Sequence, residues 1–168
     1  PQPPLQIIGL DTIYCLDSPP SVLTGYVPGG VFAGPGIVIT PTDTVFDPSV
    51  AGEGLHTITY SYTSATGCPY VIAVDVMVNP IPSVDAGQNM QICAGATANL
   101  HAMPTGGTAP YSFMWESVPA GWTSTSQNPV VQPTTTVQYI VTVTDVNGCT
   151  ASDDMWINVT TFPVAIIS

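Results

Sequence analysis

Residues 139–159 read YIVTVTDVNGCTASDDMWINV, and residues 58–78 read ITYSYTSATGCPYVIAVDVMV. In both stretches, apolar side chains alternate with polar ones on either side of a Gly-Cys pair. A period of two over six or more residues predicts a half-buried β-strand, and a glycine-bearing segment between two such runs predicts a hairpin. Each stretch is therefore expected to form two antiparallel strands joined by a turn.

The two stretches belong to a repeat of about 80 residues. Cys15 precedes Cys93 by 78 positions, and Cys68 precedes Cys149 by 81 positions. Self-similarity at such a spacing indicates two homologous structural units. We therefore predict one module over residues 1–79 and a second over residues 80–162, joined at the short, stiff segment Asn79-Pro80-Ile81-Pro82.

Shorter apolar runs, separated by Pro and Gly, fill the rest of both modules, and no stretch has a sustained 3.6-residue period. Six or seven short strands in about 80 residues predict a β-sandwich, so we expect an all-β chain of two tandem sandwiches. The further strands are expected over residues 5–10, 21–26, 31–32, 37–40, 44–46, 96–102 and 111–115.

The four cysteines are even in number and similarly spaced in the two modules. This pattern favours the disulfides Cys15–Cys68 and Cys93–Cys149, each within its own module. Buried free thiols are the alternative. A zinc site is disfavoured because the sequence has no Cys-x-x-Cys pair.

The charge balance is unusual for a chain of 168 residues. It has 11 Asp and Glu residues, no Lys or Arg, and a formal net charge of −11, whereas roughly 20 basic residues would be ordinary at this length. Nucleic acid is therefore not expected as a partner, because phosphate recognition needs basic side chains. Membrane insertion is not expected either, because the apolar runs are only strand-length. The first residue is Pro1 and not an initiator methionine, which suggests a processed or excised product.

Acid–base residues are few, and no enzyme is predicted. His56 and His101 are accompanied by neither a Gly-x-Ser-x-Gly nor a His-Glu-x-x-His motif. Both are therefore expected to be ordinary residues at strand edges, and no cofactor is predicted.

Carboxylate and amide side chains around the last predicted hairpin are candidate calcium ligands, because hard oxygen atoms suit Ca²⁺. They are Asp145, Asn147, Asp153 and Asp154. Their spacing is not that of a calcium-binding loop, so a solvated acidic rim is the favoured alternative.

The three tryptophans are expected in three different settings. Trp115 lies on an alternating strand and is expected in the core. Trp122 lies in a predicted loop, where it could be a tucked anchor or a contact residue for sugar or a neighbouring module. Trp156 is out of phase with Met155 and Ile157, so it is expected to face outward as a contact residue.

The second module resembles the polycystic-kidney-disease-like (PKD-like) immunoglobulin modules of giant secreted proteins of the Bacteroidetes, and the first looks like a sister module. The motifs that carry the resemblance are Val84-Asp85-Ala86-Gly87, Ile92-Cys93-Ala94-Gly95, Pro104-Thr105-Gly106-Gly107, Thr134-Thr135-Thr136 and Asp145-Val146-Asn147-Gly148-Cys149, with Tyr14-Cys15, Gly34-Pro35-Gly36 and Phe46-Asp47-Pro48 in the first module.

This resemblance implies an immunoglobulin-like fold and an extracellular or cell-surface location. Such modules occur in tandem arrays, mostly as spacers or adhesive units. We therefore expect a structural repeat of a surface protein or filament whose partners are copies of itself or adjacent modules. A module that binds surface polysaccharide is the alternative.

Two further features follow from the resemblance and from the end of the sequence. Thr12 and Thr44 lie in Asp-Thr-aliphatic triplets that resemble the O-glycosylation pattern of exported Bacteroidetes proteins. Residues 163–168 contain the apolar side chains Val164, Ile166 and Ile167. This tail is expected to be a linker or a strand donated into a neighbouring module.

Overall fold

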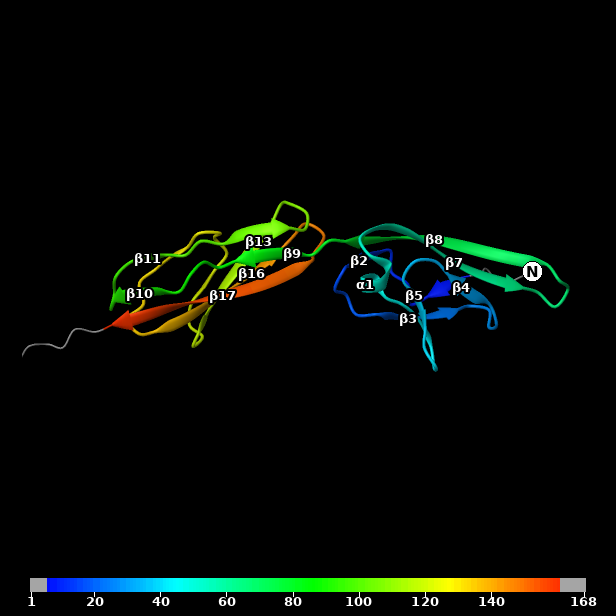
Figure 1. Ribbon diagram of the computed structural model, residues 1–168, viewed down its shortest axis with the longest axis horizontal. Helices are drawn as coiled ribbons and strands as arrows, with labels where there is room; N and C mark the ends of the chain where they lie inside the picture. Colours follow the sequence, from blue (N-terminus) through cyan, green and yellow to red (C-terminus); the bar gives the residue numbers. More distant parts are fainter. Residues whose placement is uncertain (1–5, 161–168) are drawn as a thin grey trace, which may run out of the picture. The chain divides into compact units, whose positions relative to one another are not determined.

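The computed structural model describes residues 6–160. The chain divides into two compact units, Pro1–Pro80 and Ile81–Ser168 (Figure 1). The division falls one residue after the predicted boundary. Each unit is a β-sandwich, as predicted.

The first unit contains two four-stranded sheets, with strand orders β1-β3-β6-β5 and β2-β8-β7-β4. Its elements are β1 (Ile7–Ile8), β2 (Ile13–Cys15), β3 (Ser21–Gly25), β4 (Val31–Ala33), β5 (Ile37–Ile39), β6 (Thr44–Phe46), the helix α1 (Pro48–Ala51), β7 (Gly54–Thr63) and β8 (Pro69–Asn79).

The core of the first unit forms where the two sheets face each other. Leu23 and Phe46 come from one sheet, and Ile58, Tyr60 and Val76 come from the other; all five are buried in one cluster. The alternation read from residues 58–78 therefore produces the buried face, as predicted.

The helix α1 was not predicted. It spans four residues, too few to create a periodic pattern. Asp47 caps it by accepting the backbone N–H of Ser49 at 3.0 Å, and Pro48 supplies a fixed φ at its first position. Local capping residues, rather than apolar periodicity, therefore determine this turn.

The second unit contains a five-stranded sheet, β10-β17-β16-β13-β14, and two two-stranded pairs, β11-β15 and β12-β9. Its elements are β9 (Pro82–Asp85), β10 (Met90–Cys93), β11 (Ala98–Asn99), β12 (Met103–Gly106), β13 (Ser112–Val118), β14 (Thr123–Ser124), β15 (Val130–Val131), β16 (Val137–Thr144) and β17 (Thr150–Thr160).

Trp115 lies at the centre of the second core, as predicted, with 0% of its surface exposed. Val141 and Ile157 from the five-stranded sheet belong to the same buried cluster, together with Leu100 and Val131 from the opposite layer. The two-stranded pairs thus cover one face of the larger sheet.

The predicted hairpins are both present as the longest antiparallel ladders of their units. β7 pairs with β8 from Thr63–Pro69 to Gly54–Val78, and β16 pairs with β17 from Thr144–Thr150 to Val137–Ile157. Gly67 and Gly148 have φ values of +81° and +85° in the turns, a conformation that favours glycine.

Two predicted strands are shorter than expected. β1 spans only Ile7–Ile8, and Leu5 lies outside the described residues. β11 spans only two residues of the predicted 96–102 strand. There the Leu100 N–H still reaches the carbonyl of Pro129, but proline has no N–H to return a bond, so the regular ladder stops.

Candidate functional site

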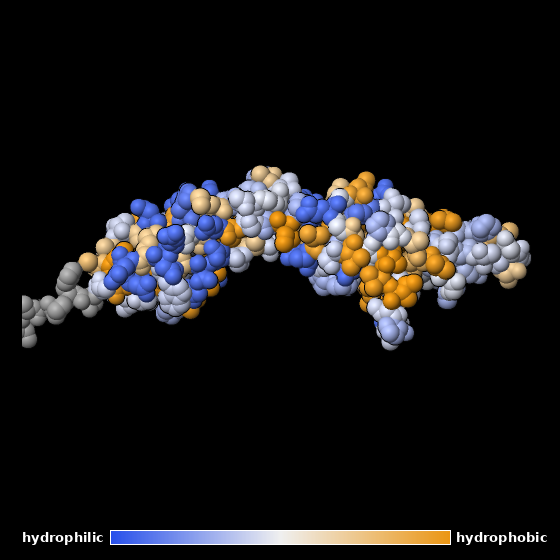
Figure 2. All heavy atoms as spheres, in the orientation of Figure 1, coloured by the Kyte–Doolittle hydropathy of each residue, from blue (hydrophilic) through white to orange (hydrophobic). Residues whose placement is uncertain are grey.

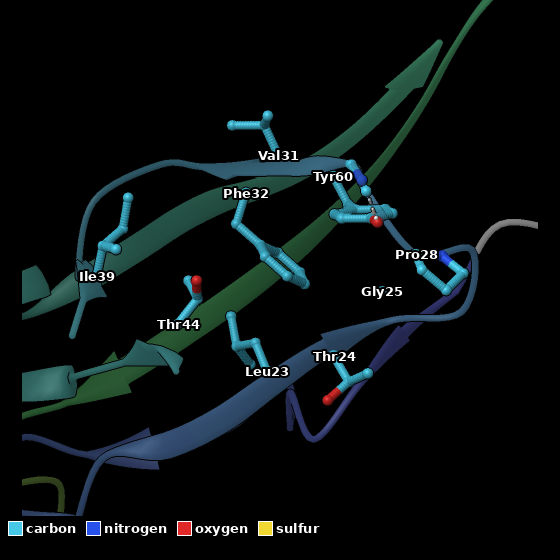
Figure 3. A pocket seen from close by; sticks show the side chains of 11 residues that line it. Leu23, Thr24, Gly25, Pro28, Val31, Phe32, Ile39, Thr44 and Tyr60 are labelled. Carbon is cyan, nitrogen blue, oxygen red and sulfur yellow. Dashed lines mark hydrogen bonds between the residues drawn. The ribbon is translucent and has the colours of Figure 1, made fainter. Parts of the chain in front are cut away.

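A groove of about 390 Å³ opens in the first unit between its two sheets (Figure 3). Leu23 from β3 and Phe32 from β4 point into the space between the sheets, and Tyr60 from β7 closes one side. Val31 and Ile39 stand at its rim and are 62% and 76% exposed. The groove is therefore mainly apolar and open to solvent.

Two strand edges flank this groove. β4 is the last strand of one sheet and β5 is the last strand of the other, so each has one unpaired edge within the described residues. An unpaired edge presents backbone N–H and C=O groups to any strand that approaches. The groove thus combines an apolar interior with two available edges.

Tyr60 fixes the shape of the groove. Its hydroxyl accepts the N–H of Gly30 at 2.9 Å and donates to the carbonyl of Val27. Its ring lies 4.5 Å from that of Phe32, with an angle of 43° between the planes. These contacts hold the loop between β3 and β4 against β7.

Gly25 leaves room for this tyrosine. A Cβ atom at Gly25 would lie 2.0 Å from Cζ of Tyr60, far inside van der Waals contact. We expect Gly25→Ala to lower the free energy of unfolding of the first unit by about 1–3 kcal/mol through overpacking. Tyrosine near-UV circular dichroism during urea unfolding measures this loss. Stability equal to that of the wild type would contradict the assignment.

Hydrophobic residues gather on the first unit near β3 and β5 (Figure 2). Val22 and Ile39 are among its exposed apolar residues. Contiguous exposed apolar surface commonly marks an interaction site. In the strand register Ile39 shares a face with Leu23, whereas Val22 lies on the opposite face of the sheet, so of these two residues Ile39 belongs to the rim of the groove.

The predicted disulfides Cys15–Cys68 and Cys93–Cys149 are wrong. Cys68 and Cys93 are exposed free thiols, whereas Cys15 and Cys149 are disulfide-bonded. The sequence spacing suggested pairs within modules without taking account of the lengths of the strands.

Strand length explains the error. Cys15 lies opposite Asn79, where β8 finishes, whereas Cys68 lies just before β8 begins. Eleven residues of strand separate these places by roughly 36 Å, whereas disulfide formation needs Cα atoms within about 7 Å. Cys93 opposite Thr160 is separated from Cys149 by the 11 residues of β17 in the same way.

The carboxylates proposed for calcium are separate and hydrogen-bonded to protein groups. Asp145 is buried, and its oxygens accept the N–H groups of Thr108, Asn147 and Cys149, each at 2.9 Å. Among residues 6–160, no group of three or more His, Cys, Asp or Glu side chains is arranged to hold a metal ion. Asp145 instead organises the β16–β17 turn, a role that the sequence interpretation missed.

The other two candidate carboxylates have different partners. Asp153 accepts the N–H of Ala86 at 2.8 Å, and Asp154 accepts the side-chain amide of Gln138 at 2.9 Å. The predicted acidic rim is thus divided between a backbone contact and an exposed side-chain pair.

The two histidines contact uncharged groups. Nε2 of His56 lies 2.8 Å from the carbonyl oxygen of Gly52, and Nδ1 of His101 contacts the side-chain oxygen of Asn128. Neither contact is with a serine or cysteine nucleophile.

Trp122 and Trp156 differ in exposure. Trp122 packs against the second core, with its ring 5.3 Å from that of Tyr139 in a T-shaped contact. It is therefore a tucked anchor, and it also lines a shallow groove with Gln132 and Thr135. Trp156 is 40% exposed on the outer face of the five-stranded sheet, as its phase predicted.

Burial raises the pKa of the Tyr139 phenol above its ordinary value of 10.0. The unfolded chain therefore loses the phenol proton at a lower pH than the folded chain does. The contribution of the protonated phenol to the free energy of unfolding is complete below about pH 10 and is lost as the pH rises through the folded-state pKa. We expect the second unit to lose stability in that alkaline window, measured by urea unfolding. Tyr139→Phe should make the loss shallower; an unchanged slope would contradict this.

The remaining predicted sites differ in how far the structure describes them. Thr12 is exposed, whereas Thr44 is half-buried in β6 and lines the groove. Val164, Ile166 and Ile167 lie outside the described residues. No helix within residues 6–160 is long and apolar enough to cross a membrane.

No family model and no curated protein matches the sequence. Among solved structures, the chain is similar to a 282-residue C-terminal fragment of intimin, in complex with the intimin-binding domain of its translocated receptor. The identity is 11% and the TM-score is 0.50, covering 90% of this chain and 62% of that chain.

Two further structures are the insect immune protein hemolin (12% identity, TM-score 0.46, 95% of this chain and 47% of that chain) and the tandem immunoglobulin repeats of Dlar (12%, 0.40, 95% and 99%). The chain thus spans about half the length of hemolin. At these identities the likeness concerns the fold alone. The two units are tandem β-sandwiches, each built of facing layers of strands.

Proposed function

We propose that the chain is a structural repeat module of an extracellular bacterial surface protein or filament, and that it assembles head to tail with its neighbours. The observation that carries this proposal is the groove of the first unit, where exposed Val31 and Ile39 lie on two strands whose outer edges are unpaired within residues 6–160. A PKD-like origin in the Bacteroidetes and an extracellular location belong to the same proposal and rest on the sequence motifs.

The occupant proposed for the groove is residues 163–168 of a second copy. This segment contains Val164, Ile166 and Ile167 and has no charged side chain. A strand added to an exposed sheet edge gains main-chain hydrogen bonds, while its alternate side chains fill apolar pockets. An extended apolar peptide therefore matches both properties of the groove.

The charge of the chain supports an apolar mode of assembly. With a net charge of −11 and no Lys or Arg, copies repel one another and have no lysine or arginine for ion pairs. Burial of apolar surface and backbone hydrogen bonds must therefore supply the attraction. Because salt screens the repulsion, with a Debye length of about 8 Å at 0.15 M, assembly should strengthen as salt is added.

The proposal is tested with the full chain, with a chain lacking residues 163–168, and with Ile39→Lys. Electron microscopy and sedimentation should detect linear assemblies for the wild type and their loss in both variants. A lysine on an edge strand disfavours pairing with another strand. The added lysine also reduces the net repulsion between copies, which by itself would favour assembly. A loss of assembly in Ile39→Lys would therefore be specific to the groove.

Val50→Lys is the matched control. Val50 is 60% exposed on α1 and does not line the groove, so this variant adds the same charge at a site without a strand edge. It should assemble like the wild type. Wild-type chains that stay monomeric at all salt concentrations, or equal assembly by Ile39→Lys, would contradict the proposal.

A second candidate function is glycan binding at the outer face of the second unit. Trp156 lies opposite Gln138 in the sheet register, and Gln138 donates to Asp154 beside it. An exposed aromatic face with an adjacent amide and carboxylate provides both stacking and hydrogen bonding. Binding on a glycan array that is lost in Trp156→Ala and kept in Trp122→Ala would support this candidate; no binding by the wild type would refute it.

A further inference from the structure

The four cysteines occupy two kinds of position. Cys15 and Cys93 are each the last residue of a short strand that runs parallel to the last strand of the unit. In the strand register, Cys15 lies opposite Asn79, and Cys93 lies opposite Thr160. Both therefore lie where the last strand finishes, which we call the exit end of the unit.

The backbone around these two cysteines is the same. In each unit, the residue three positions after the cysteine donates its N–H to the cysteine carbonyl at 3.0 Å. The residue directly after the cysteine donates to the carbonyl of the paired residue, at 2.9 Å for Asn79 and 3.2 Å for Thr160. Cys93 is thus the structural counterpart of Cys15.

Cys68 and Cys149 occupy the other position, in the turn between the last two strands. The carbonyl of each accepts, at 2.9 Å, the N–H of the residue four positions earlier, which is Ser64 or Asp145. A side-chain oxygen of the same Ser64 or Asp145 residue accepts the cysteine N–H, at 3.1 Å in the first unit and 2.9 Å in the second. Cys68 is the structural counterpart of Cys149.

The two positions lie at opposite ends of a unit. β8 begins directly after Cys68 and runs to Asn79, and β17 begins directly after Cys149 and runs to Thr160. The turn cysteines therefore mark the end opposite the exit end. In a head-to-tail array, the exit end of one module adjoins the turn end of the next module. The exit-end cysteine of the first module and the turn cysteine of the second are then the two that can approach each other.

One cysteine of each kind is disulfide-bonded, namely Cys15 and Cys149, and one of each kind is an exposed free thiol. We propose that Cys93 of one copy and Cys68 of the next form a disulfide that links copies covalently, head to tail. This inference rests on the proposed assembly function, and it identifies the partner as a second copy of the same chain.

The linkage is an oxidation, so it needs a disulfide oxidant such as oxidised glutathione. The Cys68 thiolate attacks one glutathione sulfur and releases one glutathione thiol. The Cys93 thiolate of the second copy then displaces the other glutathione. Both cysteine sulfurs are oxidised, and their two protons end on two glutathione thiols.

The test starts with full-length protein that has not been reduced, so that the bonds of Cys15 and Cys149 are kept. Thiol titration should count two reactive thiols per chain. After treatment with oxidised glutathione, non-reducing electrophoresis should show a ladder of covalent multimers. Pepsin digestion at low pH, which limits disulfide exchange, should yield a linked peptide that contains Cys68 and Cys93.

Single variants establish the polarity of the link. On non-reducing denaturing electrophoresis, Cys68→Ser and Cys93→Ser should each run as a monomer, and an equal mixture of the two should form a covalent heterodimer and nothing larger. A control that carries both Cys68→Ser and Val50→Cys keeps two exposed thiols, one at the wrong place, and should give no ladder.

Several outcomes would overturn the inference: a Cys68–Cys93 bond within one chain, links between identical cysteines, or thiols that stay free in assembled protein. Filaments formed without the link would refute the inference and leave the assembly function standing. A ladder that persists in Ile39→Lys would support the inference and count against the groove.

Discussion

Asp145→Ala is expected to lower the free energy of unfolding of the second unit by about 3–4 kcal/mol. Asp145 is 5% exposed, and its carboxylate accepts three backbone N–H groups. Hydrogen bonds to a charged group contribute about 1.5–3 kcal/mol each, and a buried N–H left without a partner adds its own desolvation cost. Because water can enter an exposed turn, the total should remain well below the sum of three bonds.

Tryptophan fluorescence during urea unfolding measures this loss selectively, because Trp115, Trp122 and Trp156 all lie in the second unit. The first unit supplies a natural control, since Ser64 holds the position of Asp145 and its Oγ accepts one backbone N–H, that of Cys68, where the Asp145 carboxylate accepts three. Ser64→Ala should therefore lower the free energy of unfolding of the first unit by only about 1 kcal/mol.

Asp145→Ser separates the contributions within the turn. A serine can reproduce the bond to the Cys149 N–H, as Ser64 does for Cys68, but it is too short to reach Thr108 as well. We expect an intermediate stability. An Asp145→Ala variant as stable as Asp145→Ser would show that the bond to the Cys149 N–H contributes nothing measurable and that the contacts with Thr108 and Asn147 carry the stabilisation.

Trp115→Ala is expected to cost about 3–5 kcal/mol, the range for truncating a large aromatic side chain in a core. An 80-residue domain has a total stability of about 4–12 kcal/mol. This one truncation could therefore leave the second unit largely unfolded. The fluorescence of Trp122 and Trp156 would report it, while tyrosine circular dichroism of the first unit should be unchanged.

Trp115→Phe is the variant that keeps the experiment informative. The indole Nε1 of Trp115 is buried and has no hydrogen-bond partner among the described residues. Phenylalanine therefore removes volume without breaking a hydrogen bond, and we expect a loss of only about 1–2 kcal/mol. Equal losses for the two variants would contradict a packing role.

The hairpins and the two-unit organisation could be predicted because they depend on local patterns. Alternation around a Gly-Cys pair determines both the buried faces and the turns of β7–β8 and β16–β17. The burial of Trp115 follows from the same alternation. These features need no knowledge of which distant strands become neighbours.

The groove and the disulfides could not be predicted for the opposite reason. The groove is lined by residues from five strands, β3 to β7, so it exists only once both sheets have formed. The cysteine pairing failed because a spacing in sequence carries no direction along a strand. The role of Asp145 had a usable signal, since Asp-x-Asn-Gly favours a turn in which the Asp side chain accepts backbone N–H groups.

The parallel pairing of an early strand with the last strand has a mechanical consequence. β2 runs alongside β8 over three residue pairs, and β10 runs alongside β17 over four. Tension applied through neighbouring modules pulls such strands along their length, so the connecting hydrogen bonds are loaded together instead of opening one by one. Under such tension, the longer pairing should make the second unit the last to yield.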